Sequence, residues 1–169
     1  KRQVKEMGSG CMKDNNNVYF RARKNAAMYN EKLSSREGAA EMLGICVSTL
    51  ADYELDITKV VPVDKVVMMA DIYNCPELKT QYCKQECPIG KRMPLATRVR
   101  SIEGIALRMI REFDPDKIKE MKNDLIGIAA DGIITDDEKP VLSDILKRLD
   151  SLAEVISEMR LIGEKVMKG

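Results

Sequence analysis

The sequence predicts an all-α protein. Apolar residues make up 44% of the 169 residues, which is enough for a buried core and argues against wholesale disorder. Aromatic residues reach only 4%, Trp is absent and Met occurs 11 times, a composition that suits packed helices better than a β-sandwich. Apolar residues recur at steps of three and four, and no stretch alternates in the manner of a half-buried strand.

Composition also bounds the function. There is no His, which removes the usual general base and the commonest zinc ligand, so we expect neither an enzyme nor a cofactor. The net charge of +1 provides no global field for nucleic acid. Five Cys, an odd number, favour a reducing compartment and a cytoplasmic protein. No apolar run reaches the roughly 20 residues of a membrane helix, and the opening KRQVKEMGSG lacks the apolar stretch of a signal peptide.

The first 75 residues predict a flexible lead-in followed by a small helical domain. Residues 1–17 carry no periodicity and are expected to be mobile. Ser34 or Ser35 is suited to cap the second helix of the domain, with Glu37 in its first turn. Together the four predicted helices define a domain over 18–75, and they span residues 18–31, 36–43, 47–55 and 63–73.

Residues 35–54, SREGAAEMLGICVSTLADYE, predict two helices joined by a tight turn. Gly44 lies where the chain must turn sharply, a position that favours positive φ, and Cys46 stands where a Ser would ordinarily cap the next helix. The predicted inner face consists of Ala39, Ala40, Leu43, Ile45, Leu50 and Tyr53. The outward face, which in this geometry would enter a DNA major groove, consists of Val47, Ser48, Thr49, Ala51 and Asp52.

Together with VPVDKVVMMADIYN at 61–74, this stretch makes residues 18–74 similar to the Cro/CI-type helix-turn-helix domain of phage and bacterial transcriptional regulators (the xenobiotic-response-element family). The resemblance covers about a third of the chain and spans three helices with their turns. It implies a lambda-repressor-like helical bundle. It also implies a regulator that binds double-stranded DNA and acts by occupying an operator.

Carried over by position, the resemblance implies roles for individual residues. Arg36 and Lys59 would contact phosphate, and Glu54 would form a structural ion pair with Arg21 or Arg23. The base-facing positions would be Val47, Ser48, Thr49, Ala51 and Asp52.

The predicted recognition helix departs from the family where bases are read. It carries no Arg, Lys, Asn or Gln, the residues that make bidentate contacts to guanine and adenine, and each missing contact forfeits about 1–3 kcal/mol of discrimination. Ser48 and Thr49 can make only single hydrogen bonds. This departure favours an alternative, in which a degenerate helix-turn-helix serves as a protein-interaction adaptor or antirepressor with a protein partner.

Residues 76–94 predict a linker that contains Cys and Pro. Cys75, Cys83 and Cys87 have the spacing C-x7-C-x3-C, which leaves a zinc site one ligand short in a chain without His. We therefore expect no metal, and either buried or free thiols or a reversible redox pair of Cys83 and Cys87 across one helical turn. DGIITDDE at 131–138 is too short for an EF-hand and instead predicts a turn with a capping box of Thr135 and Glu138.

Residues 95–169 predict long helices in a hairpin or coiled coil, which would serve oligomerisation or sensing. Asp114 and Pro115 predict the start of a helix that runs to about Ala130. Because helices of unequal length leave part of the longest stripe uncovered, we expect a homodimer through 95–169, which suits two DNA half-sites about one helical turn apart. The two heptad stripes consist of Leu95, Val99, Ile102, Ala106, Met109 and Phe113, and of Leu142, Ile145, Leu149, Leu152, Ile156, Met159, Gly163 and Val166.

Overall fold

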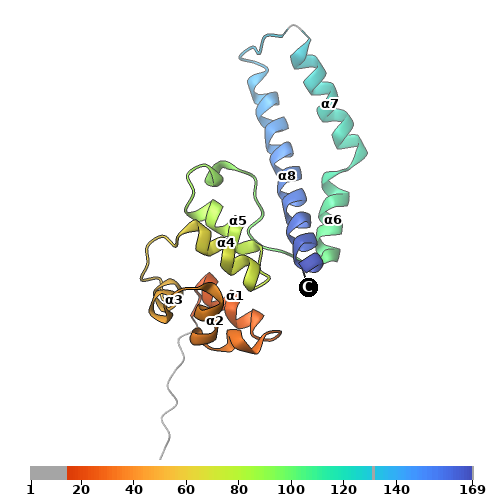
Figure 1. Cartoon of the computed structure of the whole chain (residues 1–169). Coiled ribbons are helices and arrows are strands. Elements are labelled where there is room, and N and C mark those ends of the chain that lie inside the picture. The colour runs from red at the N-terminus through yellow and green to blue at the C-terminus, as the bar shows by residue number, and fades with distance from the viewer. Residues whose placement is uncertain (1–14, 131, 169) are drawn as a thin grey trace, which may run out of the picture. The chain divides into compact units, whose positions relative to one another are not determined.

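The fold is described by a computed structural model for residues 15–130 and 132–168, so most of the predicted lead-in 1–17 lies outside the described residues. Over the described ranges the chain is helical without any strand, which confirms the all-α prediction (Figure 1). No helix within these ranges is long and apolar enough to cross a membrane. Contacts divide the chain into two compact units between Val61 and Pro62, inside the predicted domain 18–75, and that domain assignment stays a prediction.

The first unit contains α1 (Val18–Ala26), the 3-10 helix η1 (Glu31–Ser34), α2 (Arg36–Leu43) and α3 (Val47–Glu54). Helix α1 ends before the predicted residue 31, because Asn30 adopts an extended conformation and its side chain accepts a hydrogen bond from the amide of Lys32 to start η1. Leu33 of η1 is thereby buried. Helix α1 packs on η1 and α3, and α2 packs on both η1 and α3.

The turn between α2 and α3 follows from Gly44. This residue adopts φ 60° and ψ 40°, the left-handed conformation that glycine accepts without steric cost. The amides of Gly44 and Ile45 then bond to carbonyls of the last turn of α2, a common way to end a helix. The residues expected on the inner face are buried except Ile45, which is half-buried: Ala39, Ala40, Leu43, Leu50 and Tyr53 are each at most 6% exposed.

Gly38 has a role that the sequence did not predict. A Cβ atom added to it would lie 2.1 Å from the carbonyl oxygen of Lys32, closer than real contacts allow. Only glycine therefore lets the first turn of α2 approach η1 this closely. Ser35, predicted as one of two candidate caps, accepts a hydrogen bond from the Gly38 amide and fixes the start of α2.

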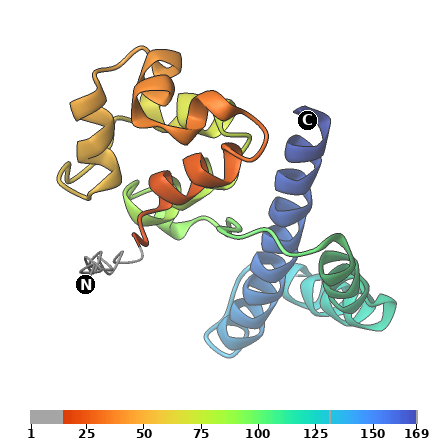
Figure 2. The same ribbon diagram turned by 90° about the horizontal axis from the view of Figure 1, so that it is seen from below.

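The second unit contains two helices near its start, α4 (Val63–Ile72) and α5 (Glu77–Gln85), and the short 3-10 helix η2 (Gly90–Arg92). Three longer helices follow: α6 (Ile102–Glu112), α7 (Pro115–Ala129) and α8 (Lys139–Lys168). Helix α4 packs on α5, and both α6 and α7 lie along α8 (Figures 1 and 2). Asp114 caps α7 and Pro115 is its first residue, as the sequence predicted.

The predicted capping box of Thr135 and Glu138 is only half formed, and it lies before the last helix instead of capping it. The Glu138 carboxylate accepts hydrogen bonds from the amide and hydroxyl of Thr135, at 2.8 and 2.7 Å. Helix α8 begins only after Glu138, however, so Thr135 does not cap it. The acidic segment forms a turn of its own before the helix.

The predicted heptad stripes are only partly the core of the hairpin. Helix α6 begins at Ile102, so Leu95 and Val99 precede it, and the side chain that α6 buries completely is Ile105. On α8 the predicted stripe is buried at Ile145 but exposed further along the helix. Its exposed members are Leu149 at 41%, Ile156 at 45% and Val166 at 74%.

Part of the predicted stripe on α8 is exposed because α8 meets different neighbours along its length. Arg148 pairs with Glu120 of α7, and Glu158 pairs with Arg108 of α6. Nearer the end, Lys168 pairs with Asp71 of α4. The buried side of α8 therefore rotates along the helix, and one straight stripe cannot face every partner. The residues that α8 buries are Ile145, Val155, Glu158 and Leu161.

Candidate nucleic-acid interface

Helix α3 presents one face outward and one face to the core. Val47 is 39% exposed and Ser48 is exposed, whereas Thr49, Ala51 and Asp52 are half-buried. The opposite face is formed by Leu50, Tyr53 and Glu54, all of which are buried. The five predicted base-facing residues thus lie on one side of a single helix, and the two at its N-terminus are the most accessible.

The buried face of α3 is anchored by an ion cluster around Glu54. The carboxylate is fully buried and accepts two hydrogen bonds from Arg23 of α1, at 2.5 and 2.9 Å. The Arg23 side chain is itself only 2% exposed, and its Nη1 donates to the carbonyls of Leu33 and Ser34. The structure therefore pairs Glu54 with Arg23. The other predicted candidate, Arg21, bonds to Asn16 instead.

Arg36 belongs to the same cluster. Its Nε donates to the Glu54 carboxylate at 2.7 Å, and a third of its side chain remains exposed. The sequence suggested only a phosphate contact for this residue. The geometry gives it a structural role as well, because two arginines share one carboxylate and leave the cluster with a net positive charge.

Burial alone would raise the pKa of the Glu54 carboxyl. Hydrogen bonds from Arg23 and Arg36, together with their positive charges, outweigh this effect, so the pKa of Glu54 is lowered from its ordinary value of 4.5. The carboxylate is consequently ionised at neutral pH. The cluster holds α1, α2 and α3 together through one charged group.

Two asparagines before α1 also position α3, which the sequence did not predict. The Asn17 amide donates to the Tyr53 carbonyl at 2.8 Å, and the Asn15 amide donates to the Glu54 carbonyl at 2.9 Å. Asn17 also caps α1 with its side-chain oxygen. These bonds satisfy carbonyls at the end of α3 that have no partner within the helix. Asn15–Asn17 therefore belong to the folded unit, although they were assigned to the mobile lead-in.

The segment after α3, residues 55–60, combines one exposed lysine with several exposed apolar side chains. Lys59 is exposed and has no ion-pair partner within the described ranges. Three apolar side chains of this segment are also exposed: Leu55 at 52%, Ile57 at 66% and Val60 at 46%. With Val47 they make the surroundings of α3 unusually apolar for a DNA-binding surface, which is normally polar and positive.

The cysteines do not form the predicted helical pair. Helix α5 ends at Gln85, so Cys83 lies on it and Cys87 does not, and both thiols are free. Burial, with a smaller contribution from the nearby Glu77 carboxylate, raises the pKa of the Cys75 thiol to about 12. The redox pair stays a prediction without the helical spacing on which it depended. Among residues 15–130 and 132–168, no group of His, Cys, Asp and Glu is arranged to hold a metal ion.

A second buried carboxylate lies on α8. Glu158 is 2% exposed and accepts hydrogen bonds from the Arg100 amide at 2.9 Å and the Arg108 guanidinium at 2.8 Å. The neighbouring Ser157 hydroxyl accepts from the Ala96 amide. These bonds fasten the segment before α6 to α8. No sequence pattern distinguished Glu158 from the other charged residues of this helix.

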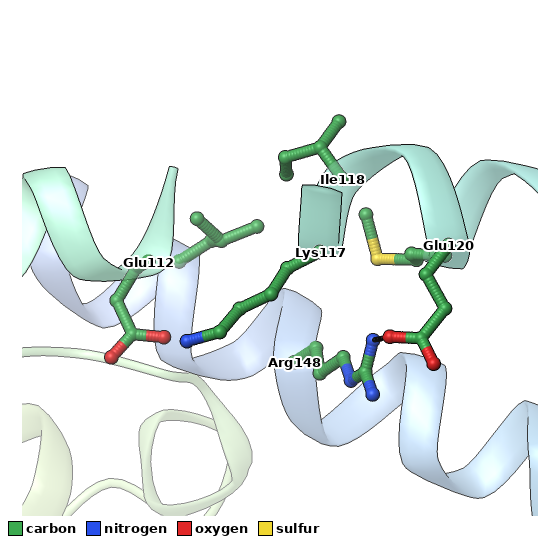
Figure 3. Close-up of a pocket in the computed structure, with 7 residues that line it drawn as sticks. Glu112, Lys117, Ile118, Glu120 and Arg148 are labelled. Atoms are coloured by element: carbon green, nitrogen blue, oxygen red, sulfur yellow. Dashed lines mark hydrogen bonds and ion pairs between the residues drawn. The ribbon is translucent and has the colours of Figure 1, made fainter. Parts of the chain in front are cut away.

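A pocket of about 260 Å³ lies where α6, α7 and α8 meet (Figure 3). Its lining consists of three apolar residues, Ile118, Met121 and Leu152, and four charged ones, Glu112, Lys117, Glu120 and Arg148. Arg148 is paired with Glu120 at 2.9 Å, and the Lys117 ammonium donates to the Arg111 carbonyl. Arg148 is paired with Glu120, and Lys117 is bound to a neutral carbonyl, so the two cations and two carboxylates of the lining give the pocket no net charge that would select a ligand.

Comparisons with known proteins leave the family open. No protein family, curated protein sequence or solved protein structure matches this chain significantly. The resemblance of residues 18–74 to Cro/CI-type regulators therefore rests on the residues themselves.

Proposed function

We propose that this chain is a DNA-binding transcriptional regulator that occupies its operator as a dimer and performs no catalysis. The observation that carries the proposal is the two-faced character of α3. Its outward residues at Val47 and Ser48 are accessible, while its inner face is fixed by apolar burial and by the Glu54 cluster. A helix held this rigidly, after a tight glycine turn, has the properties of a helix that enters a major groove.

Phosphate binding would come from three features. Lys59 is exposed beyond the end of α3, and Arg36 keeps exposed surface while it pairs with Glu54. At its other end, α3 follows Cys46 at the N-cap position, whose side chain makes no capping hydrogen bond. Free amides at a helix N-terminus attract phosphate groups. Together these groups would hold α3 against the DNA backbone.

Base reading would be modest. Val47 can contact a thymine methyl and Ser48 can make one hydrogen bond, whereas Asp52 would be repelled by phosphates. Sequence preference would therefore depend on two half-sites and on DNA shape rather than on strong contacts to single bases.

A second function is favoured by a different observation. The exposed apolar side chains of Val47, Leu55, Ile57 and Val60 around α3 suit a protein partner better than a phosphate backbone. In this alternative the helix-turn-helix serves as an adaptor or antirepressor and does not touch DNA.

The test is the binding of the full chain to a labelled mixed-sequence duplex, measured by fluorescence anisotropy over a series of salt concentrations. Lys59→Ala should weaken binding and reduce the salt dependence by about one phosphate contact. The matched control is Lys122→Ala, which removes an exposed lysine of α7 and should change neither quantity. No binding at low salt would reject the regulator and favour the adaptor.

A second variant separates base reading from phosphate binding. Ser48→Ala should change the relative affinities for different duplexes more than it changes the average affinity. Equal weakening on all duplexes would mean that Ser48 contacts the backbone. Arg36→Ala is a poorer probe, because it would also disturb the Glu54 cluster.

A further inference from the structure

Helix α8 carries an apolar line that no part of the described chain covers completely. Its members recur at steps of four and three, the spacing of a coiled-coil seam. Leu146 is 53% exposed, Leu149 41%, Ile156 45% and Met167 90%. The line spans residues 142–167, about 38 Å at 1.5 Å per residue. Its apolar members are Leu142, Leu146, Leu149, Ala153, Ile156 and Met167.

Two positions in this seam, Arg160 and Gly163, carry no apolar side chain. Arg160 is exposed, and it makes no hydrogen bond or ion pair within the described ranges. Gly163 lies in the middle of a helical turn, where glycine is less favourable than alanine. A Cβ atom added to Gly163 would meet nothing within 4 Å. No contact inside the chain therefore explains why this position is so small.

An antiparallel pair of α8 helices accounts for both positions. With the two-fold axis between Ala153 and Ile156, the two pairs that contain a small residue each match it with a large one. Leu146 then meets Gly163 of the partner subunit, and Ile156 meets Ala153 of the partner subunit. Such alternation of large and small side chains is what lets two helices approach closely and pack without voids.

Charge selects the same orientation. In the antiparallel register, Arg160 lies opposite Leu149 of the partner subunit and next to Asp150 of the partner subunit. Asp150 is exposed, and like Arg160 it has no ion pair within the described ranges. A parallel pair would instead place Arg160 against Arg160 of the partner subunit, and like charges at a seam are unfavourable.

We infer that this face of α8 is a dimer interface, at which a second copy of the chain packs antiparallel and Arg160 pairs with Asp150 of the partner subunit. The inference deepens the proposed function, because it supplies the surface and the orientation of the dimer. It does not depend on DNA binding, since the seam and its unpaired charges are properties of α8 alone.

The first experiment is sedimentation equilibrium of the full chain without DNA. The unmodified protein should be a dimer. Gly163→Leu should weaken dimerisation at least about tenfold, because the added side chain fills the space that Leu146 of the partner subunit would occupy. The matched control is Gly127→Leu on α7, whose added Cβ also meets nothing within 4 Å, and it should leave the dimer unchanged. Circular dichroism of both variants checks that they fold.

The second experiment tests the orientation by exchanging charges. Arg160→Asp and Asp150→Arg should each weaken the dimer, and the double variant should recover most of the lost affinity. A monomeric unmodified protein, or a dimer indifferent to Gly163→Leu, would overturn the interface. A double variant no tighter than the single ones would overturn the antiparallel register. Because DNA is absent, these failures are distinct from a failure of the Lys59 salt test.

Discussion

Each of the two units buries one glutamate between two arginines, and the two clusters are built differently. Glu54 is fully buried with Arg23, whose side chain is 2% exposed. Glu158 is buried as deeply, but the side chains of its partners Arg100 and Arg108 are 56% and 18% exposed. Water therefore reaches the positive charges of the second cluster and is excluded from Arg23 in the first.

This difference teaches what each cluster does. A charge pair removed from water interacts strongly but is costly to bury, so removal of one member leaves an uncompensated charge. At Glu54 this makes the position of α3 depend on α1 and α2 together. At Glu158 the side chain of Arg100 is exposed and that of Arg108 is partly so, and both can return to water, so the cluster acts as a fastening between α8 and the segment before α6. We expect the first unit to be the more sensitive of the two.

The largest effect should follow from Arg23→Ala. This change leaves the buried Glu54 with only Arg36, and it should destabilise the first unit by about 3–5 kcal/mol. The measurement is urea denaturation, with hydrogen exchange of residues 47–54 to assign the loss. Arg21→Ala, which removes a neighbouring exposed arginine, is the control and should cost less than about 0.5 kcal/mol. Equal effects of the two variants would refute the assigned role of Arg23.

A smaller effect is expected from Glu158→Ala. The Arg100 amide would lose its acceptor, and the loss should be about 1–3 kcal/mol in the second unit. Glu154→Ala, one turn earlier and half exposed, should cost less because its pair with Arg108 is accessible to water. If Glu158→Ala destabilised the protein more than Arg23→Ala does, the first unit would not be the more sensitive of the two.

The pKa of Glu54 predicts a pH dependence of the first unit. Because the folded-state pKa is lowered, the unfolded chain takes up a proton at higher pH than the folded chain. The stabilisation is therefore complete above about pH 4.5, the ordinary pKa of the group, and is lost as the pH falls through the lowered pKa of the folded state. Glu54→Gln should reduce the loss of unfolding free energy below about pH 4.5, as measured by denaturation at a series of pH values. An unchanged loss of stability at low pH in Glu54→Gln would mean that Glu54 does not cause it.

The smallest effect concerns reactivity alone. Because the pKa of the Cys75 thiol is raised to about 12, this residue should be alkylated by iodoacetamide much more slowly at pH 8 than the exposed Cys46. Mass spectrometry of the labelled peptides measures both rates in one sample. Comparable rates would mean that Cys75 is not shielded in solution.

The first unit was largely predictable because its signals are local. Gly44, Ser35 and the apolar spacing of residues 39–53 predicted the turn, the cap and the buried face, and each depends on only a few neighbouring residues. The tethers from Asn15 and Asn17 were not predictable, since an asparagine before a helix carries no mark of a distant carbonyl partner. The double role of Arg36 was missed for the same reason.

The hairpin was predictable only in outline. Long helices follow from heptad spacing, but spacing alone cannot say which of two adjacent stripes faces a neighbour. Leu149 and Ile156 belong to the predicted stripe, part of which was expected to stay uncovered, and both are exposed because α8 turns different sides to α7 and α6. An uncovered part of the stripe was expected from the unequal helix lengths, but which residues form it depends on the tertiary packing.

The most direct test of the central claim is a selection of DNA sites from a random duplex pool by the full chain at moderate salt, followed by salt titration of the enriched sites. The proposed function predicts a palindromic site with half-sites about one helical turn apart, whose affinity falls as salt rises. Lys59→Ala should bind the enriched site more weakly and with a smaller salt dependence, whereas Lys122→Ala should bind it as the unmodified chain does. Absence of any enriched site, even at low salt, would contradict DNA reading and leave α3 as a surface for a protein partner.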